Sequence, residues 1–109
     1  MLILFDNNTP RGLARFLSGH FVEEARMRGW DQLANGELIV MAEQAGFEVM
    51  VTADKNIRYQ QNLTARKIAL VVLENSQWPM VRQVAEKIVL AINAARPGSY
   101  VEVDVPFKG

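Results

Sequence analysis

Short apolar segments alternate along the chain with segments of helical spacing, and this alternation restricts the fold more than any other feature. Residues 2–5 and 68–73 are apolar throughout, as expected of strands that are covered on both faces. Residues 47–52 form a further strand segment, and residues 21–22 begin a weaker one. Strands that alternate with helices in this way predict a three-layer α/β/α fold with a mostly parallel central sheet.

The helical segments are marked by their caps and by their apolar spacing. Thr9 is the expected N-cap of a first helix, Asn35 caps a second helix that ends at Gly46, and Pro79 opens the longest one. A short helix or turn is expected over residues 56–63. The expected buried faces are Leu13, Phe16 and Leu17 in the first helix, Leu38, Met41, Ala42 and Ala45 in the second, and Val81, Val84, Ala85, Ile88 and Ile92 in the longest.

Length and composition predict a single domain over residues 1–109. The 12 basic residues balance the 12 acidic ones, so a polyanion would have to bind through a local patch or a metal ion. The absence of cysteine excludes thiolate and disulfide chemistry. The first apolar stretch is too short for a signal peptide, and none reaches the roughly 20 residues of a membrane span. We therefore expect a cytoplasmic protein with no membrane partner.

Residues 100–105 alternate between polar and apolar side chains, as in a half-exposed strand at the edge of a sheet. An edge strand leaves backbone groups free to pair with another chain. We therefore expect a homodimer or a partner-bound form.

Three acidic residues lie where a strand is expected to pass into a helix. Asp6 follows residues 2–5, Asp54 follows residues 47–52, and Glu37 lies in the opening turn of the second helix. In a parallel sheet these turns share the carboxyl edge, so we expect the three carboxylates to converge there. Converging carboxylates repel unless a proton or a cation intervenes, and their hard oxygens suit Mg²⁺ or Mn²⁺.

Each acid also has a purely structural interpretation. Asp6 can hold a turn with Asn7 and Asn8, Glu37 can favour a helix through the dipole, and Asp54 can cap a helix. The only histidine, His20, lies at the opposite edge of the expected sheet, where a structural hydrogen bond is the better interpretation.

Basic and amide side chains near the same edge are candidates for phosphate or base contacts, with solvated surface charge as the alternative. They are Arg26, Arg28, Lys55, Arg58, Arg66, Lys67, Gln60, Gln61 and Asn62. No glycine-rich phosphate loop is present, which argues against a nucleotide-dependent enzyme.

Several of these segments together resemble a known family. Residues 4–10, with the pattern D-x-N-x-P from Asp6, are similar to the start of small bacterial PIN-like proteins, largely of uncharacterised function. Residues 35–38 and 51–56 resemble their second and third blocks. The resemblance covers nearly the whole chain. It implies a PIN-like fold and ancestry among Mg²⁺-dependent ribonucleases, including the toxins of toxin–antitoxin pairs.

The chain also departs from that family. Asn35 and Asn56 stand where PIN nucleases usually carry aspartates, and amide oxygens ligate a metal without contributing charge. With the resemblance, these residues predict a toxin-like endoribonuclease in which Asp6 and Asp54 bind one Mg²⁺ or Mn²⁺ ion, with Glu37 as the third ligand or as the group that orients water. Asn8, Asn35, Asn56, Arg58 and Gln61 would support it, and RNA and an antitoxin-like protein would be the partners. The alternative is a non-catalytic PIN-like module that binds a protein or RNA.

Overall fold

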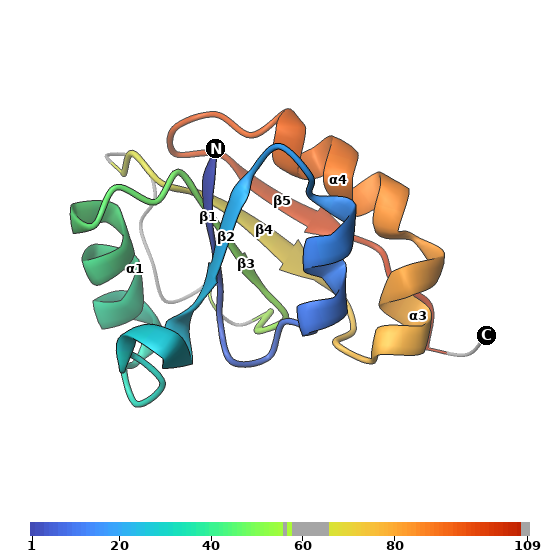
Figure 1. The fold of residues 1–109 in the computed structure, drawn as a ribbon, viewed down its shortest axis with the longest axis horizontal. Helices are drawn as coiled ribbons and strands as arrows, with labels where there is room; N and C mark the ends of the chain where they lie inside the picture. Colours follow the sequence, from blue (N-terminus) through green and yellow to red (C-terminus); the bar gives the residue numbers. More distant parts are fainter. Residues whose placement is uncertain (56, 58–65, 108–109) are drawn as a thin grey trace.

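The sheet holds five parallel strands in the order β2-β1-β3-β4-β5. The computed structural model describes residues 1–55, 57 and 66–107 (Figure 1). The strands are β1 (Leu2–Phe5), β2 (Phe21–Glu24), β3 (Val49–Thr52), β4 (Ala69–Leu73) and β5 (Tyr100–Val103). All four pairings are parallel, so every strand ends at the same edge. The expected parallel α/β sheet is confirmed, with β2 and β5 at its two sides.

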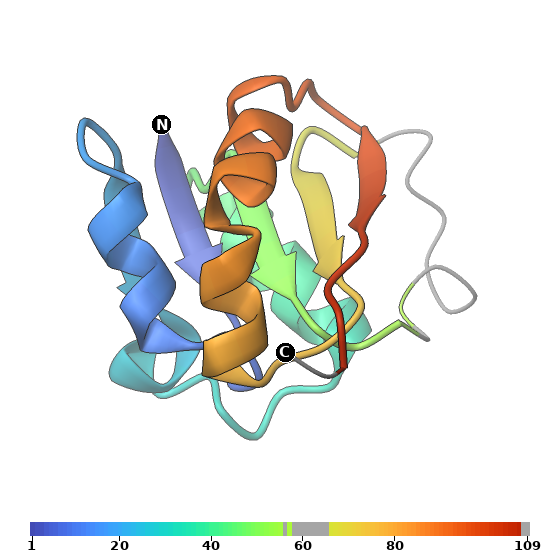
Figure 2. The same ribbon diagram turned by 90° about the vertical axis from the view of Figure 1, so that its right-hand side faces the viewer.

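Helices cover both faces of the sheet, which makes three layers (Figures 1 and 2). One face packs against the 3-10 helix η1 (Arg11–Phe16) and the helices α3 (Trp78–Gln83) and α4 (Ala85–Asn93). The other face packs against α1 (Asn35–Gln44), and a second short 3-10 helix, η2 (Ala25–Arg28), follows β2. Within the described residues, no helix is long and apolar enough to cross a membrane.

Neighbouring residues of the central strands enter opposite cores. Ile3 and Phe5 belong to the core under η1, α3 and α4, whereas Leu4 belongs to the core under α1. All three are at most 1% exposed, as the continuous apolar run predicts for a strand covered on both sides. The sheet is therefore a rigid base for the loops at its carboxyl edge.

The chain leaves β1 and β3 toward opposite faces. After β1 it enters η1 on one face, whereas Ile57, after β3, lies in the core of the other face. β1 and β3 are neighbours in the sheet, so their loops diverge at the point where the winding reverses. In parallel α/β folds this switch point is where ligands bind.

The helices differ from the expected pattern in several places. The longest helix breaks at Val84, whose φ of −116° and ψ of 21° are not helical, so it becomes α3 and α4. Phe16 and Met41 are 40% and 38% exposed, although apolar spacing predicts burial, and Ile39 is buried in α1 instead. A 3-10 helix has three residues per turn, which moves Phe16 off the buried stripe of an α-helix. Most of residues 56–63 lies outside the described part of the chain.

Candidate functional site

Asp6 lies directly after β1 and is nearly buried, with 7% of its surface exposed. Its backbone N–H donates to the Val51 carbonyl at 3.1 Å, which extends the pairing of β1 with β3 by one residue. One carboxylate oxygen, Oδ1, accepts the backbone N–H of Asn8 and contacts the Thr9 hydroxyl, each at 3.0 Å. The turn after β1 is therefore built around this carboxylate.

The Thr9 hydroxyl has two acceptors but only one hydrogen. It lies 2.6 Å from the Val51 carbonyl oxygen and 3.0 Å from Asp6 Oδ1. The hydroxyl therefore links the Asp6 turn to the end of β3. Thr9 therefore serves the Asp6 loop and does not cap η1, whose N-cap residue is Pro10.

Thr52 joins the ends of β1 and β3. Its side chain is fully buried, and its hydroxyl donates to Asp6 Oδ2 while accepting the backbone N–H of Asp54 at 3.1 Å. One hydroxyl thus connects the carboxylate of the first acid to the backbone of the second. The Asp6 and Asp54 positions are fixed relative to each other by the sheet.

Burial raises the pKa of Asp6 above its ordinary value of 3.8. Hydrogen bonds from Thr52, Thr9 and Asn8 act in the opposite direction, and the negative charge of Asp54 raises the pKa further. The two carboxylates therefore interact electrostatically, as expected of acids that follow adjacent parallel strands. A proton or a cation near Asp6 relieves this unfavourable state.

Asn35, the first residue of α1, donates its side-chain amide to Asp54 Oδ2 at 2.6 Å. It does not cap the helix, because Ala34 is the N-cap residue and makes no side-chain cap bond. The amide ties the start of α1 to the loop after β3. Asn35 therefore lies beside Asp54, its supporting role stays a prediction, and its expected capping role is wrong.

Glu37 is exposed in the first turn of α1 and lines a shallow, mainly apolar hollow with Trp30, Leu33, Gly36, Val40 and Met41. Across residues 1–55, 57 and 66–107, no three acidic or histidine side chains lie close enough to hold one metal ion. Asp6, Glu37 and Asp54 therefore do not form the three-carboxylate group expected from the sequence. The reason is helical geometry, because Glu37 follows Asn35 by two positions, which is about 200° around the axis of α1 from the residue that contacts Asp54.

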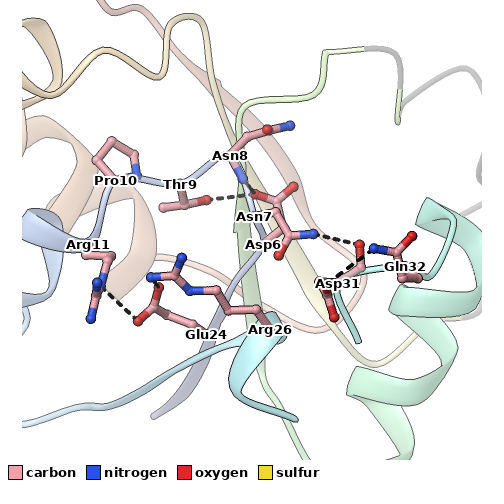
Figure 3. Close-up of a pocket in the computed structure, with 10 residues that line it drawn as sticks. All are labelled: Asp6, Asn7, Asn8, Thr9, Pro10, Arg11, Glu24, Arg26, Asp31 and Gln32. Atoms are coloured by element: carbon pink, nitrogen blue, oxygen red, sulfur yellow. Dashed lines mark hydrogen bonds and ion pairs between the residues drawn. The ribbon is translucent and has the colours of Figure 1, made fainter. Parts of the chain in front are cut away.

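A pocket of about 590 Å³ opens beside Asp6 (Figure 3). Its wall comes from the loop after β1, the end of β2, the start of η2 and the segment before α1, where Asn7 donates to the Asp31 carbonyl at 3.0 Å. The lining residues are Asp6, Asn7, Asn8, Thr9, Pro10, Arg11, Glu24, Arg26, Asp31 and Gln32. Asn8 lines this pocket together with Asp6, and its supporting role stays a prediction.

Glu24, the last residue of β2, binds two arginines at the mouth of this pocket. Arg11 Nε and Arg26 Nη2 each lie 3.2 Å from one of its carboxylate oxygens (Figure 3). Glu24 and Arg11 are not singled out by sequence reasoning, because the strand signal fades after Val22. The sequence feature that could have identified Glu24 is its position, because it is an acid at the end of a strand, as Asp6 and Asp54 are.

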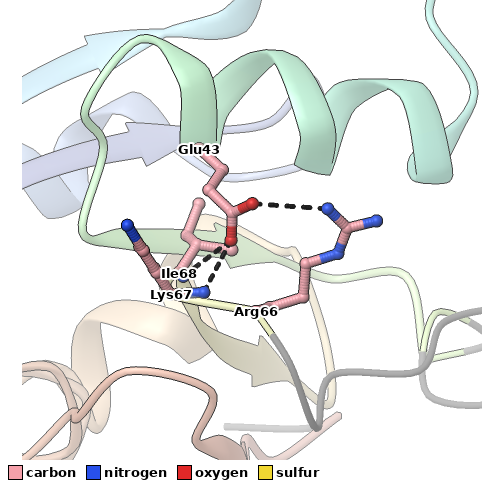
Figure 4. A network of polar contacts seen from close by, with 4 residues as sticks. All are labelled: Glu43, Arg66, Lys67 and Ile68. Carbon is pink, nitrogen blue, oxygen red and sulfur yellow. Dashed lines mark hydrogen bonds and ion pairs between the residues drawn. The ribbon is translucent and has the colours of Figure 1, made fainter.

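Three other basic candidates, Arg28, Lys55 and Arg66, form ion pairs away from the pocket, and Lys67 contacts Glu43 through its backbone. Arg28 is bound by Glu23 at 2.8 Å, and Lys55 lies 3.6 Å from Glu74. Glu43 accepts the Lys67 and Ile68 backbone N–H groups, at 2.6 and 3.4 Å, and the Arg66 guanidinium at 3.3 Å (Figure 4). These bonds, with that of Lys67 foremost, lower the pKa of Glu43 and join α1 to the approach to β4. Asn56, Arg58, Gln60, Gln61 and Asn62 lie outside the described residues.

His20 lies at the amino edge, far from the acids along the strands. Its ring contacts Asn93 Oδ1 through Nε2 at 2.9 Å and the amino group of Met1 through Nδ1 at 3.1 Å. These contacts join the turn before β2 to the end of α4. The structural interpretation of His20 is confirmed.

No protein-family model, no curated protein and no solved structure matches the chain.

The donor set at the switch point suits a hard divalent cation. Asp6 and Asp54 supply carboxylate oxygens, and the side-chain amide of Asn35 lies beside Asp54. Mg²⁺ typically keeps several waters and needs only one or two carboxylates together with substrate phosphates. Two carboxylates that repel each other therefore fit such an ion without a third acid.

Proposed function

We propose that the chain is a PIN-like endoribonuclease that depends on Mg²⁺ or Mn²⁺, with Asp6 and Asp54 as the protein ligands of the ion. The observation that carries the proposal is the buried Asp6 carboxylate, whose pKa is raised by burial and by Asp54 at the switch point of a parallel sheet. Burying Asp6 beside the half-buried Asp54 costs free energy, and cation binding would recover it.

The chain's own residues would orient the acids and the substrate. Thr52 holds Asp6 and the backbone of Asp54 in a fixed relation, and Asn35 restrains the Asp54 side chain. A bound Mg²⁺ or Mn²⁺ supplies Lewis-acid polarisation of a phosphate oxygen and lowers the pKa of a bound water. The adjoining pocket gives a substrate direct access to Asp6.

A non-catalytic module that binds RNA or a protein remains the second candidate. It is favoured by one contact, the Asn35 amide on Asp54 Oδ2, which occupies an oxygen that a ligand ion would use. The toxin role and the antitoxin partner stay predictions from the resemblance, and a small DNA-binding protein encoded next to this chain would support both.

The deciding assay is cleavage of a mixed RNA pool in Mn²⁺ by the wild type, Asp6→Asn, Asp54→Asn and Asn35→Asp. Glu37→Gln is the matched control, because it removes an acid that is exposed and outside the pocket. We expect Asp6→Asn and Asp54→Asn to lose at least about 100-fold, the upper end of what changes around a metal site cost. Asn35→Asp should cleave faster, and Glu37→Gln should match the wild type.

Equal cleavage by the wild type, Asp6→Asn and Asp54→Asn would overturn the proposal and point to another nuclease in the sample. An inactive wild type together with an active Asn35→Asp variant would instead identify a PIN-like module that has lost its chemistry.

A further inference from the structure

Two arginines on different elements meet at one carboxylate beside the pocket. Arg11 begins η1, Arg26 lies in η2, and both bind Glu24 at 3.2 Å (Figure 3). Their side chains are 71% and 48% exposed, whereas that of Glu24 is 23% exposed. The cluster therefore carries two positive charges against one negative charge, and its cationic members face water.

Each guanidinium of this cluster has N–H donors that do not contact Glu24. A guanidinium carries five N–H donors. In the part of the chain that the structure describes, Arg11 uses Nε and Arg26 uses Nη2, both on Glu24, and no other protein acceptor is within reach. The remaining donors are available to a ligand in the pocket that both side chains line.

Arg28 is bound more closely than the arginines of this cluster. It binds both oxygens of Glu23, at 2.8 and 3.1 Å, and its guanidinium lies 5.2 Å from the ring centre of Trp30 and 4.9 Å from that of Phe47. Arg28 contacts its carboxylate partner with two nitrogens, whereas Arg11 and Arg26 each use one. Arg11 and Arg26 have unused forks beside an open pocket.

We propose that Arg11 and Arg26 are a phosphate-binding pair that holds the backbone of single-stranded RNA next to Asp6. The inference rests on the proposed function for the choice of RNA. Guanidinium groups bind phosphate oxygens in a two-pronged geometry that suits these free forks. Glu24 positions the pair by holding one nitrogen of each.

The pocket lining fits the sugar–phosphate backbone better than a base. None of its ten residues is aromatic, whereas recognition of single-stranded bases usually uses an aromatic stacking surface. The amides of Asn7 and Gln32 are bonded to Asp31 within the same wall. Its volume of about 590 Å³ is that of a small-ligand pocket, which suits part of one strand. The lining therefore favours contacts to the backbone of one strand, and such contacts do not depend on base sequence.

The test measures binding without cleavage. A fluorescein-labelled single-stranded RNA of mixed sequence, with every 2′-hydroxyl methylated, is titrated by anisotropy in EDTA and low salt. Proteins to compare are the wild type, Arg11→Gln with Arg26→Gln, and Arg15→Gln. Arg15 is the matched control, because it is an exposed arginine of the same helix that does not line the pocket.

We expect the double variant to bind the RNA at least about tenfold more weakly than the wild type. Each phosphate contact on a single strand contributes about 0.7 to the slope of log K against log salt, so losing two contacts should reduce the magnitude of that slope by about 1.4. Arg15→Gln should bind within about twofold of the wild type, because a lone exposed charge gives a weak, screened contribution. Replacing Arg11 and Arg26 by lysine should restore part of the affinity, since lysine keeps the charge and loses the fork.

Three results would overturn this inference: no binding by the wild type, equal binding by the double variant, or an equal loss in Arg15→Gln. Its failure is distinct from that of the proposed nuclease. If the double variant loses binding while the wild type cleaves no RNA, the phosphate pair stands and the nuclease proposal fails. If Asp6→Asn abolishes cleavage while the double variant binds normally, the reverse holds.

Discussion

Two polar clusters lie side by side at the carboxyl edge and are built in opposite ways. The Asp6 network, formed by Asp6, Thr9, Thr52, Asp54 and Asn35, is centred on a nearly buried carboxylate held by short hydrogen bonds between adjacent strands. The arginine cluster of Arg11, Glu24 and Arg26 is held by exposed ion pairs at the outer strand.

Burial explains the difference. In the Asp6 network every polar contact replaces lost water, so its geometry is fixed and its carboxyl group has a raised pKa. In the arginine cluster water screens each ion pair, so the side chains can exchange Glu24 for another anion at little cost. The first cluster is suited to precise chemistry and the second to holding a charged substrate.

The largest effect on stability is expected from Thr52→Val. The variant keeps the shape of the side chain but leaves Asp6 Oδ2 and the Asp54 N–H without their shared partner. We expect a loss of about 2–3 kcal/mol in the free energy of unfolding, the cost of unsatisfied buried groups. Thr52→Ser keeps the hydroxyl and should lose only about 1 kcal/mol, the value of one buried methyl group. Urea denaturation at neutral pH measures both, and equal stability of the two variants would show that the hydroxyl is unimportant.

The pH dependence of stability tests the burial of Asp6. Its folded pKa is raised, so between 3.8 and that raised value the native state holds more protons than the unfolded state. This group therefore contributes fully below 3.8, and its contribution is lost as pH rises through the folded pKa. The stability of Asp6→Asn relative to the wild type should accordingly increase over that range and then level off. Denaturation curves across acidic pH for both proteins are the measurement, and a constant difference would contradict the raised pKa.

Glu24→Gln is expected to have the smallest effect. It breaks two ion pairs whose arginines are well exposed, and such pairs contribute roughly 0–1 kcal/mol each at most. We expect the free energy of unfolding to fall by less than about 1 kcal/mol in the same urea assay. If Glu24→Gln lost more free energy of unfolding than Thr52→Val, the arginine cluster would stabilise the fold more than the Asp6 network, which would contradict this comparison.

The sequence predicts the sheet and the acids at the ends of its strands well. Continuous apolar runs identify β1 and β4, and parallel strands must deliver Asp6 and Asp54 to one edge. Glu37 fails as a third member because a position in a helix depends on its angle around the axis, which the strand pattern does not determine.

The parts that sequence reasoning misses depend on side-chain contacts across elements. In the sequence, Thr52 looks like an ordinary strand residue. Its hydroxyl gains two hydrogen-bond partners only because β3 pairs with β1. Arg11, Glu24 and Arg26 are separated along the chain and meet only because β2 lies beside β1. The amino-acid composition does not indicate which side chains of different elements will contact one another.

The most direct test of the account is Mn²⁺ binding measured by the loss of the free-ion signal in electron paramagnetic resonance. The account predicts saturable binding by the wild type, a large loss in Asp6→Asn and in Asp54→Asn, and wild-type binding by Glu37→Gln. Removing a carboxylate from the pair takes away a charged ligand, whereas Glu37 lies outside the pocket beside Asp6. Binding that survives both aspartate substitutions, or that disappears with Glu37→Gln alone, would contradict a metal site built on Asp6 and Asp54.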